Sequence, residues 1–385
     1  MLGANVQEDQ LVSVGATLGQ EEMAREVAAA AYRRGARFVD IMYFDAYAKR
    51  ARIEHARAET LDFVPSWYGE RMLELGRQRA ARISLAGPAP PDALAGLDPE
   101  RAGRDQLPFI KEVLTVINER LVNWTVVPAP TLAWAQLVYP DLAGTDALER
   151  LWDEIGHVCR LDEPDPIAAW AARSKELDIV ARQLEEARLD ALHFDGPGTD
   201  LVVGLFPDGK WETAGAETVG GIRHMANLPS EEVFTSPDPA RTEGVVASSR
   251  PLALFDGPIV SGLVVRFEQG RAVEITADEG EEILRGRAAL DDGAARLGEV
   301  ALVDRESRIG RLGTTFLETL LDENAVSHIA LGDGDPSIVR DEDRSSVNNS
   351  VTHIDFMIGG DDVDVTGVTR DGSRVPVLRG GSWQL

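Results

Sequence analysis

Histidine and carboxylate side chains recur together in the second half of the chain, and these residue types suit the binding of a divalent cation. In Val351–Ile358, His353 and Asp355 alternate with the apolar Ile354 and Phe356. Because alternate side chains of a β-strand point to the same face, a strand here would direct His353 and Asp355 together and the apolar pair into a core. Oxygen and imidazole ligands suit Zn, Co, Mn or Mg. The pattern predicts part of a metal site, and a surface His–Asp pair is the alternative.

Three further positions carry residue types that bind metals, but each has a second interpretation. His328 lies in the apolar run Val326–Leu331, where a lone histidine is more often a hydrogen-bonded core residue than a ligand. Glu299 begins another apolar run, either as a solvated charge at the end of a sheet or as an inward ligand. Glu231 and Glu232 follow a proline and a serine, where an acid often only caps a turn. Pattern alone leaves these alternatives open.

Other catalytic signatures are missing from the sequence. It contains no G-x-S-x-G nucleophile turn, no G-x-x-x-x-G-K-[ST] phosphate loop and no H-E-x-x-H zinc motif. The glycine-rich segment Gly332–Pro336 carries two aspartates, which would repel a phosphate group. The single cysteine, Cys159, lies beside His157 in a helical pattern with nothing positioned to activate a thiol. Catalysis by a nucleophilic side chain is therefore not expected.

The first half of the chain reads as alternating strands and helices. Leu11–Gly15 predicts a strand, Gln20–Arg34 a helix and Phe38–Phe44 a second strand, which together form a βαβ unit and imply a parallel sheet. Thr131 is expected to cap a helix after a strand closed by prolines. The remaining expected elements of this half are Ser66–Arg79, Ala81–Leu85, a helix within Pro108–Leu121, Asn123–Val127, Ala147–Cys159 and Pro166–Arg188.

Short strands dominate the second half, with turn residues between them. The expected strands are Ala191–Phe194, Leu201–Leu205, Ile259–Phe267, Arg271–Ala277, Glu299–Val303, His328–Leu331 and Val351–Ile358, and the expected helices are Glu279–Ala295 and Thr314–Asp322. We therefore predict an α/β plus mainly β protein. Residues 1–190 form an α/β domain with a parallel sheet, and residues 191–385 form a predominantly antiparallel β domain that carries the metal site.

Composition limits the partners of the protein. The chain has 385 residues, and 39 Lys plus Arg against 65 Asp plus Glu give a formal net charge of −26. Such a field opposes binding to nucleic acid or to an anionic membrane surface. No apolar run approaches the about 20 residues that span a bilayer, and the N-terminus does not resemble a signal peptide. A single cysteine cannot form an intrachain disulfide, which fits a reducing compartment. Together with the chain length and the absence of a membrane-spanning run, this predicts a soluble, cytoplasmic protein of two domains.

Several segments, in the same order, resemble the aminopeptidase T and aminopeptidase S family of bacterial metallo-aminopeptidases. Together they extend over nearly the whole chain, which makes the resemblance more specific than any single motif. The segments are Tyr32–Arg37, Asn123–Val127, Gly196–Leu201, Ser230–Thr235, Leu297–Val303, Asp322–Ala325, His328–Gly332 and His353–Ile358.

The resemblance implies a metal-dependent aminopeptidase that removes the N-terminal residue of short peptides. It implies two divalent metal ions in the C-terminal domain, which would activate a water and polarise the scissile carbonyl. It also implies a homodimer whose active sites face an internal cavity. Carried over by motif, with Glu232 chosen over Glu231 because it directly precedes Val-Phe, the ligands would be Glu232, Glu299, His328, His353 and Asp355.

One departure from the family pattern concerns catalysis. The family usually has a tyrosine shortly after the histidine of His328–Gly332, and here that place is taken by Asp335. A phenol could hydrogen-bond a tetrahedral intermediate, whereas an ionised carboxylate would repel it. Asp335 is thus only a weak catalytic candidate, and the carboxylate that moves the proton to the leaving amine, among Glu232, Glu299 and Asp335, is not identified.

Three other functions stay open at this point. The chain could be a catalytically impaired family member that serves as a peptide- or metal-binding protein. It could be a hydrolase of other amides or esters. It could also be a structural dimeric protein that binds calcium through its acidic loop, with Asp333, Asp335 and Asp341 as ligands.

Overall fold

The computed structural model describes residues 2–90, 93, 95–105, 107–108, 110–254 and 257–385. They form two compact units. The first comprises Met1–Ile167, Ala214–Pro229 and Phe255–Pro258, and the second comprises Ala168–Thr213, Ser230–Leu254 and Ile259–Leu385. The predicted division into an α/β domain and a mainly antiparallel β domain at residue 190 stays a prediction.

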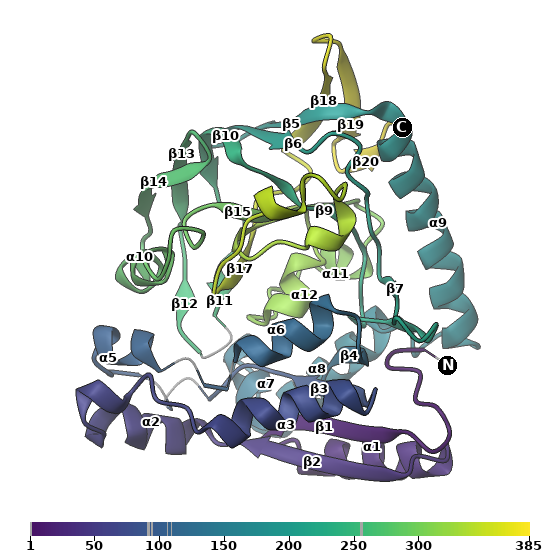
Figure 1. Cartoon of the computed structure of the whole chain (residues 1–385), viewed down its shortest axis with the longest axis vertical. Helices are drawn as coiled ribbons and strands as arrows, with labels where there is room; N and C mark the ends of the chain where they lie inside the picture. The colour runs from purple at the N-terminus through teal and green to yellow at the C-terminus, as the bar shows by residue number, and fades with distance from the viewer. Residues whose placement is uncertain (1, 91–92, 94, 106, 109, 255–256) are drawn as a thin grey trace. The chain divides into compact units, whose positions relative to one another are not determined.

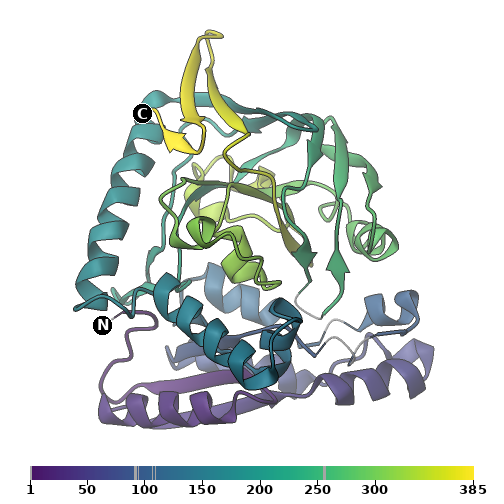
Figure 2. The same cartoon turned by 180° about the vertical axis from the view of Figure 1, so that it is seen from behind.

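A four-stranded parallel sheet organises the first unit, in the order β2-β1-β3-β4. The helix α1 (Glu21–Arg33) joins two adjacent strands, which confirms the predicted βαβ unit. Figures 1 and 2, which view the chain from opposite sides, show α1 and α3 (Ser66–Arg77) on opposite faces of this sheet. The strands are β1 (Leu11–Thr17), β2 (Phe38–Phe44), β3 (Ala81–Ala86) and β4 (Asn123–Pro128).

Capping residues begin several helices of the first unit. The Thr131 side chain accepts a hydrogen bond from the Trp134 N–H at the start of α7, as predicted, and Asp45 caps α2 in the same way. Gln20 ties the sheet together beyond its strands: its side chain accepts from Thr17 N–H and donates to the carbonyls of Ala86 and Ala129. The remaining elements are α2 (Ala46–His55), η1 (Ala58–Thr60), α5 (Pro99–Arg104), α6 (Lys111–Asn118), α7 (Leu132–Val138), α8 (Gly144–Val158), β7 (Gly215–Glu217) and β8 (Arg223–Met225).

An eight-stranded antiparallel sheet, in the order β14-β13-β10-β6-β5-β18-β19-β20, forms one layer of the second unit. Its strands arch around a smaller central sheet in Figure 1. The bounds are β5 (Leu189–Gly196), β6 (Thr199–Leu205), β10 (Pro237–Ala247), β13 (Val264–Glu268), β14 (Arg271–Thr276), β18 (Asp364–Thr369), β19 (Arg374–Arg379) and β20 (Ser382–Trp383).

The smaller sheet has four antiparallel strands in the order β17-β16-β15-β9. Alternate residues of these strands, including Val300, Ile329 and Phe356, are fully buried in the main apolar core of the unit. The strands are β9 (Glu232–Thr235), β15 (Leu297–Val303), β16 (His328–Gly332) and β17 (His353–Met357). The other elements are β11 (Leu252–Ala253), β12 (Ile259–Val260), α10 (Glu281–Ala288), α11 (Arg308–Leu312), α12 (Thr319–Glu323), η2 (Pro336–Ile338) and η3 (Arg344–Ser346).

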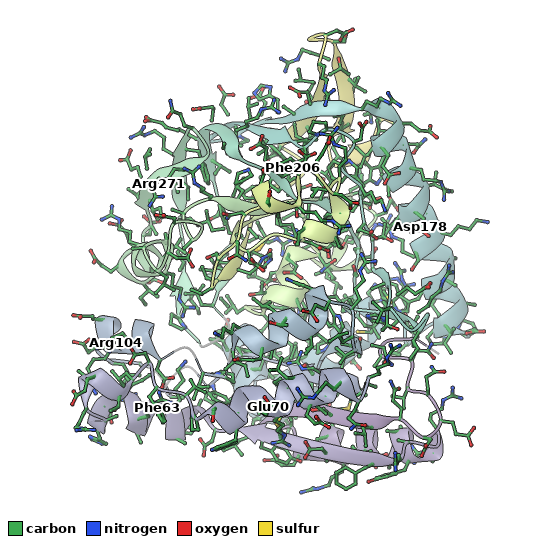
Figure 3. All side chains as sticks on the ribbon, viewed as in Figure 1. Phe63, Glu70, Arg104, Asp178, Phe206 and Arg271 are labelled. Atoms are coloured by element: carbon green, nitrogen blue, oxygen red, sulfur yellow. The ribbon has the colours of Figure 1, made fainter. Side chains whose placement is uncertain are left out.

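The long helix α9 (Pro166–Ala187) packs one face into the second unit. Its buried side chains include Trp170, Arg173 and Leu177, and the exposed Asp178 points outward from the helix in Figure 3. An arginine on the buried face is unusual, because a buried charge is stable only beside an opposite charge.

The predicted fold class is confirmed: a parallel sheet with helices, followed by mainly antiparallel β structure. Several predicted elements were wrong in extent. The helix predicted over Thr314–Asp322 spans only Thr319–Glu323. Ile259–Phe267 is two strands, because Gly262 turns the chain with φ +61°. The helix predicted to reach Ala295 ends at Ala288, and the Asp291 carboxylate then accepts from Gly293 and Ala294 N–H. Among the described residues, we find no helix with the length and apolar character that a membrane crossing requires.

Candidate metal centre

The four-stranded sheet places all five predicted ligands on one face. In its register, Glu299 and Asp355 both pair with Ala330, two positions from His328 on β16. Glu232 pairs with Val303, which shares the face of Glu299 on β15. Since side chains alternate along a strand, Glu232, Glu299, His328, His353 and Asp355 point away from the face that packs into the core. The interpretation of Ile354 and Phe356 as core residues is confirmed.

Distances show that the five side chains converge. His328 Nε2 lies 3.2 Å from Glu232 Oε2 and 3.5 Å from Glu299 Oε1. His353 Nε2 lies 3.8 Å from Glu299 Oε2 and 3.3 Å from Asp355 Oδ1. The carboxylate of Glu299 therefore stands between the two imidazoles.

A sixth residue, Glu323 at the end of α12, was not among the predicted ligands. A carboxylate oxygen of Glu323, a ring nitrogen of His328 and a carboxylate oxygen of Asp355 lie within 4.8 Å of one another. The sequence contains a signal for it, since Glu323 belongs to the segment Asp322–Ala325 that resembles the family. Its proximity to the sheet depends on how α12 packs, which the pattern of residues did not reveal. We call these six residues the acid–histidine cluster: Glu232, Glu299, Glu323, His328, His353 and Asp355.

Each histidine is oriented by a backbone carbonyl on the far side of its ring. His353 Nδ1 lies 2.8 Å from the carbonyl oxygen of Asp333, and His328 Nδ1 lies 3.3 Å from that of Val326. A carbonyl oxygen only accepts, so each Nδ1 carries the hydrogen and each Nε2 faces the carboxylates. Gly332, which pairs with His353, has φ +112°, and a Cβ there would lie 2.0 Å from the Thr352 carbonyl oxygen. Only glycine allows the chain before His353 to pass this close.

The structure distinguishes the two adjacent glutamates. Glu231, which precedes β9, is fully buried, and its carboxylate accepts a hydrogen bond of 2.6 Å from Arg173 Nε. Glu232 points into the cluster instead. Glu232 Oε2 is buried and has no hydrogen-bond partner among the described residues, although it lies near His328. A buried, unsatisfied carboxylate oxygen of this kind is expected where a cation binds.

Burial and neighbouring charges raise the pKa values of two glutamates and of both histidines in the cluster. Burial, with repulsion from Asp355 and Glu232, raises the pKa of Glu299 and raises that of Glu323 well above its usual value. Burial alone would lower the pKa of His328 and of His353, but contacts with the carboxylates raise both well above the ordinary value. Without a cation, the cluster would therefore keep protons between its acids and imidazoles.

The chemistry of the donors fits a divalent cation. One set of donor atoms from Glu232, Glu299 and His328 lies within 4.8 Å, as does the set that Glu323 provides with His328 and Asp355. Four carboxylates supply a formal charge that matches two divalent cations, and neutral imidazole is a common zinc ligand. Carboxylate and imidazole donors exclude the thiolate-rich composition of an iron–sulfur or structural cysteine site.

Asp335, the weak catalytic candidate, has a structural contact. Its carboxylate accepts from Ser337 N–H at the start of η2, and its own N–H donates to Ser236 Oγ. In the part of the chain that the structure describes, no hydrogen bond or ion pair joins Asp335 to the cluster. Asp341, a ligand in the calcium alternative, forms an ion pair with Arg344.

Several other chemistry-bearing side chains lie outside the cluster. His193 lies 2.7 Å from Asp200 on the large sheet, and His157 lies 2.8 Å from Asp162 after α8. Burial raises the pKa of the Cys159 thiol to about 12, so this cysteine is not a nucleophile.

A β-sheet that presents acids and histidines on the face opposite its core defines a candidate metalloenzyme centre. Comparison with known proteins agrees with this class. A family described as thermophilic metalloprotease (M29) matches residues 1–383. The chain belongs to this family, which confirms the resemblance found in its motifs.

Relatives match over nearly their full lengths. Aminopeptidase T of Thermus thermophilus is 43% identical over 392 residues, covering 99% of this chain and 95% of that protein. Aminopeptidase PepS of Streptococcus thermophilus is 37% identical over 395 residues, covering 100% and 95%. The solved structure of wild-type AmpT from Thermus thermophilus superposes with a TM-score of 0.89 at 42% identity, covering 100% of this chain and 96% of that one.

Proposed function

We propose that the acid–histidine cluster is the active centre of a metal-dependent aminopeptidase. The observation that carries the proposal is the convergence of six carboxylate and imidazole side chains, five from one face of a sheet and one from α12, in a chain related over its whole length to named aminopeptidases. The substrates are peptides, and we propose short peptides with a free N-terminus.

We further propose that the centre holds two divalent cations, of Zn, Co, Mn or Mg. The donor atoms form two sets that share His328, and the two oxygens of Glu299 face different histidines, so these residues would hold the cations. When bound, such cations lower the pKa of a coordinated water towards neutrality and polarise the carbonyl of the scissile bond.

Side chains and backbone groups of the protein orient the ligands and attract the substrate. The carbonyls of Asp333 and Val326 keep Nδ1 of each histidine protonated, which leaves each Nε2 lone pair free for a cation. The apolar residues on the opposite face of the sheet hold the strands rigid. The whole chain carries a formal net charge of −26, and this negative field would favour a peptide with a protonated α-amino group and so cleavage at the N-terminus.

The histidine side chains differ in access to solvent. The His353 side chain is 33% exposed, whereas that of His328 is 1% exposed. We therefore propose that the peptide approaches the cluster from the side of His353.

The test measures metal content and peptide hydrolysis by the purified protein. We expect bound divalent metal and cleavage of leucyl-p-nitroanilide but not of its N-acetylated form. A chelator and the variant His353→Ala should both abolish cleavage. His193→Ala is the matched control, because His193 also pairs with an aspartate in the second unit but outside the cluster.

Other results would decide for the alternatives. Metal binding without turnover would identify a catalytically impaired family member. Asp335, at the place where the family usually has a tyrosine, is the reason to consider this alternative. Hydrolysis of the N-acetylated substrate would indicate a hydrolase of another specificity. Homodimerisation is a separate proposal, which sedimentation equilibrium tests.

A further inference from the structure

Arg173 connects the long helix α9 with the end of the four-stranded sheet. Its Nε donates to Glu231 Oε2 at 2.6 Å, and its Nη2 donates to Asp304 Oδ1 at 2.9 Å. The side chains of all three residues are nearly inaccessible to solvent. Trp383 Nε1, from the C-terminal strand, donates to the other oxygen of Asp304 at 2.6 Å.

The two carboxylates occupy a particular place in the sheet. Glu231 directly precedes β9, and Asp304 directly follows β15. These strands are antiparallel, and their last pair is Glu232 opposite Val303. Glu231 and Asp304 are therefore the next residues beyond this pair, one on each strand. Like charges opposite each other destabilise a strand pair, and burial makes the repulsion stronger. The guanidinium of Arg173 neutralises this repulsion and holds the two strand ends together.

The same strand ends set the geometry of the cluster. β9 contributes Glu232 and β15 contributes Glu299, and both contact His328. The backbone N–H of Glu231 donates to Asn324 Oδ1 at 2.6 Å, and Asn324 directly follows Glu323. Glu231 therefore connects β9 to the end of α12 through its backbone N–H and to Arg173 on α9 through its carboxylate. Arg173 holds that carboxylate.

We propose that Arg173 is a positioning residue for the cation centre, which fixes Glu232 relative to Glu299 and His328 by clamping the ends of β9 and β15. The inference rests on the proposed function, because it takes these residues as cation ligands. Arginine suits the position better than lysine, since its planar fork donates to two carboxylates at once, whereas an ammonium group acts as a point charge.

The experiment compares Arg173→Lys and Arg173→Met with the full-length wild type after removal of metal. Calorimetric titration with Zn²⁺ gives the affinity, and the visible absorption spectrum of bound Co²⁺ reports on the ligand geometry. We expect Arg173→Met to bind Zn²⁺ about tenfold more weakly, which is the lower end of the loss caused by removing a partner of a metal ligand, because Arg173 acts through Glu231 and not on a ligand directly. Arg173→Lys should fold, bind with intermediate affinity and give an altered Co²⁺ spectrum.

Arg379→Lys is the matched control. Arg379 lies on β19, where it donates to Val365 O and Thr366 Oγ1 in the large sheet. Its replacement should leave the Zn²⁺ affinity within twofold of the wild type and the Co²⁺ spectrum unchanged.

The outcomes separate this inference from the proposed function. Wild-type protein that binds Zn²⁺, with binding lost in Glu232→Gln, supports the proposed function. If both Arg173 variants then bind as the wild type does and only melt at lower temperature, Arg173 has a purely structural role and the inference is overturned. If Arg173→Met does not fold, Arg173→Lys decides by the same criterion. Wild-type protein that binds no Zn²⁺ overturns both proposals.

Discussion

Glu299 and Asp355 lie on either side of Ala330, each paired with it in the register of a neighbouring strand. Ala330 is fully buried, and its methyl group points to the same face as the two carboxylates. A small residue at this position leaves space between the two acids, in which a cation can be held.

Replacement of Ala330 by valine should fill that space. We expect the free energy of unfolding to fall by about 1–3 kcal/mol, as in other overpacked cores, and the Zn²⁺ affinity to fall as well. Urea denaturation and calorimetric titration measure the two effects. Ala191→Val, on β5 of the large sheet, is a buried control that should leave Zn²⁺ affinity unchanged. Normal Zn²⁺ binding by Ala330→Val would contradict the placement of the cation on this face.

Glu323→Gln should weaken cation binding, because it removes a carboxylate that lies close to His328 and Asp355. We expect a loss in Zn²⁺ affinity of at least about tenfold, or a reduced number of bound ions, since a direct ligand contributes no less than a residue behind it. Metal content after dialysis gives the stoichiometry. The control is Glu306→Gln, an exposed acid paired with Arg311. An unchanged stoichiometry and affinity would remove Glu323 from the ligand set.

Glu318 predicts a dependence of stability on pH. Burial and repulsion from Asp322 raise its pKa to about 8, against an ordinary value near 4.5. The folded protein then binds more protons than the unfolded chain between these values, so this group lowers the free energy of unfolding as the pH rises from about 4.5 through about 8. Glu318→Gln keeps an oxygen that can cap α12 and removes the ionisation.

Thermal melts at pH 5, 7 and 9 test this dependence. Glu318→Gln should melt close to the wild type at pH 5 and above it at pH 9. Glu186→Gln, an exposed position on α9, should follow the wild type throughout. A variant at Glu318 that is less stable at pH 9 than the wild type would show that the carboxylate is held as a stabilising anion.

Gln20→Ala should destabilise the first unit. The Gln20 side chain is buried and makes three hydrogen bonds to backbone groups at the ends of three strands. At about 1 kcal/mol each, their loss should lower the free energy of unfolding by roughly 2–4 kcal/mol. Gln78→Ala, at an exposed position, is the control. A change below about 0.5 kcal/mol would show that water replaces these bonds without cost.

Sequence patterns predicted the structure correctly where it depends on residues that are near one another in the chain. The alternation of His353, Ile354, Asp355 and Phe356 fixes which side chains share a face of β17, and the structure agrees. In the same way, acidic residues early and basic residues late predicted the helix α1, and the prolines around Thr131 predicted its capping role.

Tertiary packing decided the features that the sequence left open. β10 contains Pro237, Pro239 and several charged residues, so its pattern does not indicate a strand, yet it pairs with β6 and β13 in the large sheet. Glu323 enters the cluster only through the docking of α12. The partnership of Arg173 with Glu231 and Asp304 joins segments far apart in the sequence, which no local pattern reveals.

The division of the four-stranded sheet into a core face and a cation face has a consequence for sequence change. Inserting or deleting one residue within β17 would rotate His353 and Asp355 into the apolar interior and turn Ile354 and Phe356 toward the carboxylates. This one-residue shift in register would remove the candidate metal centre and the packing of the apolar core together. We therefore expect insertions and deletions to be tolerated only in the loops between these strands, and occupancy by a cation would report that the strands have assembled in the correct alignment.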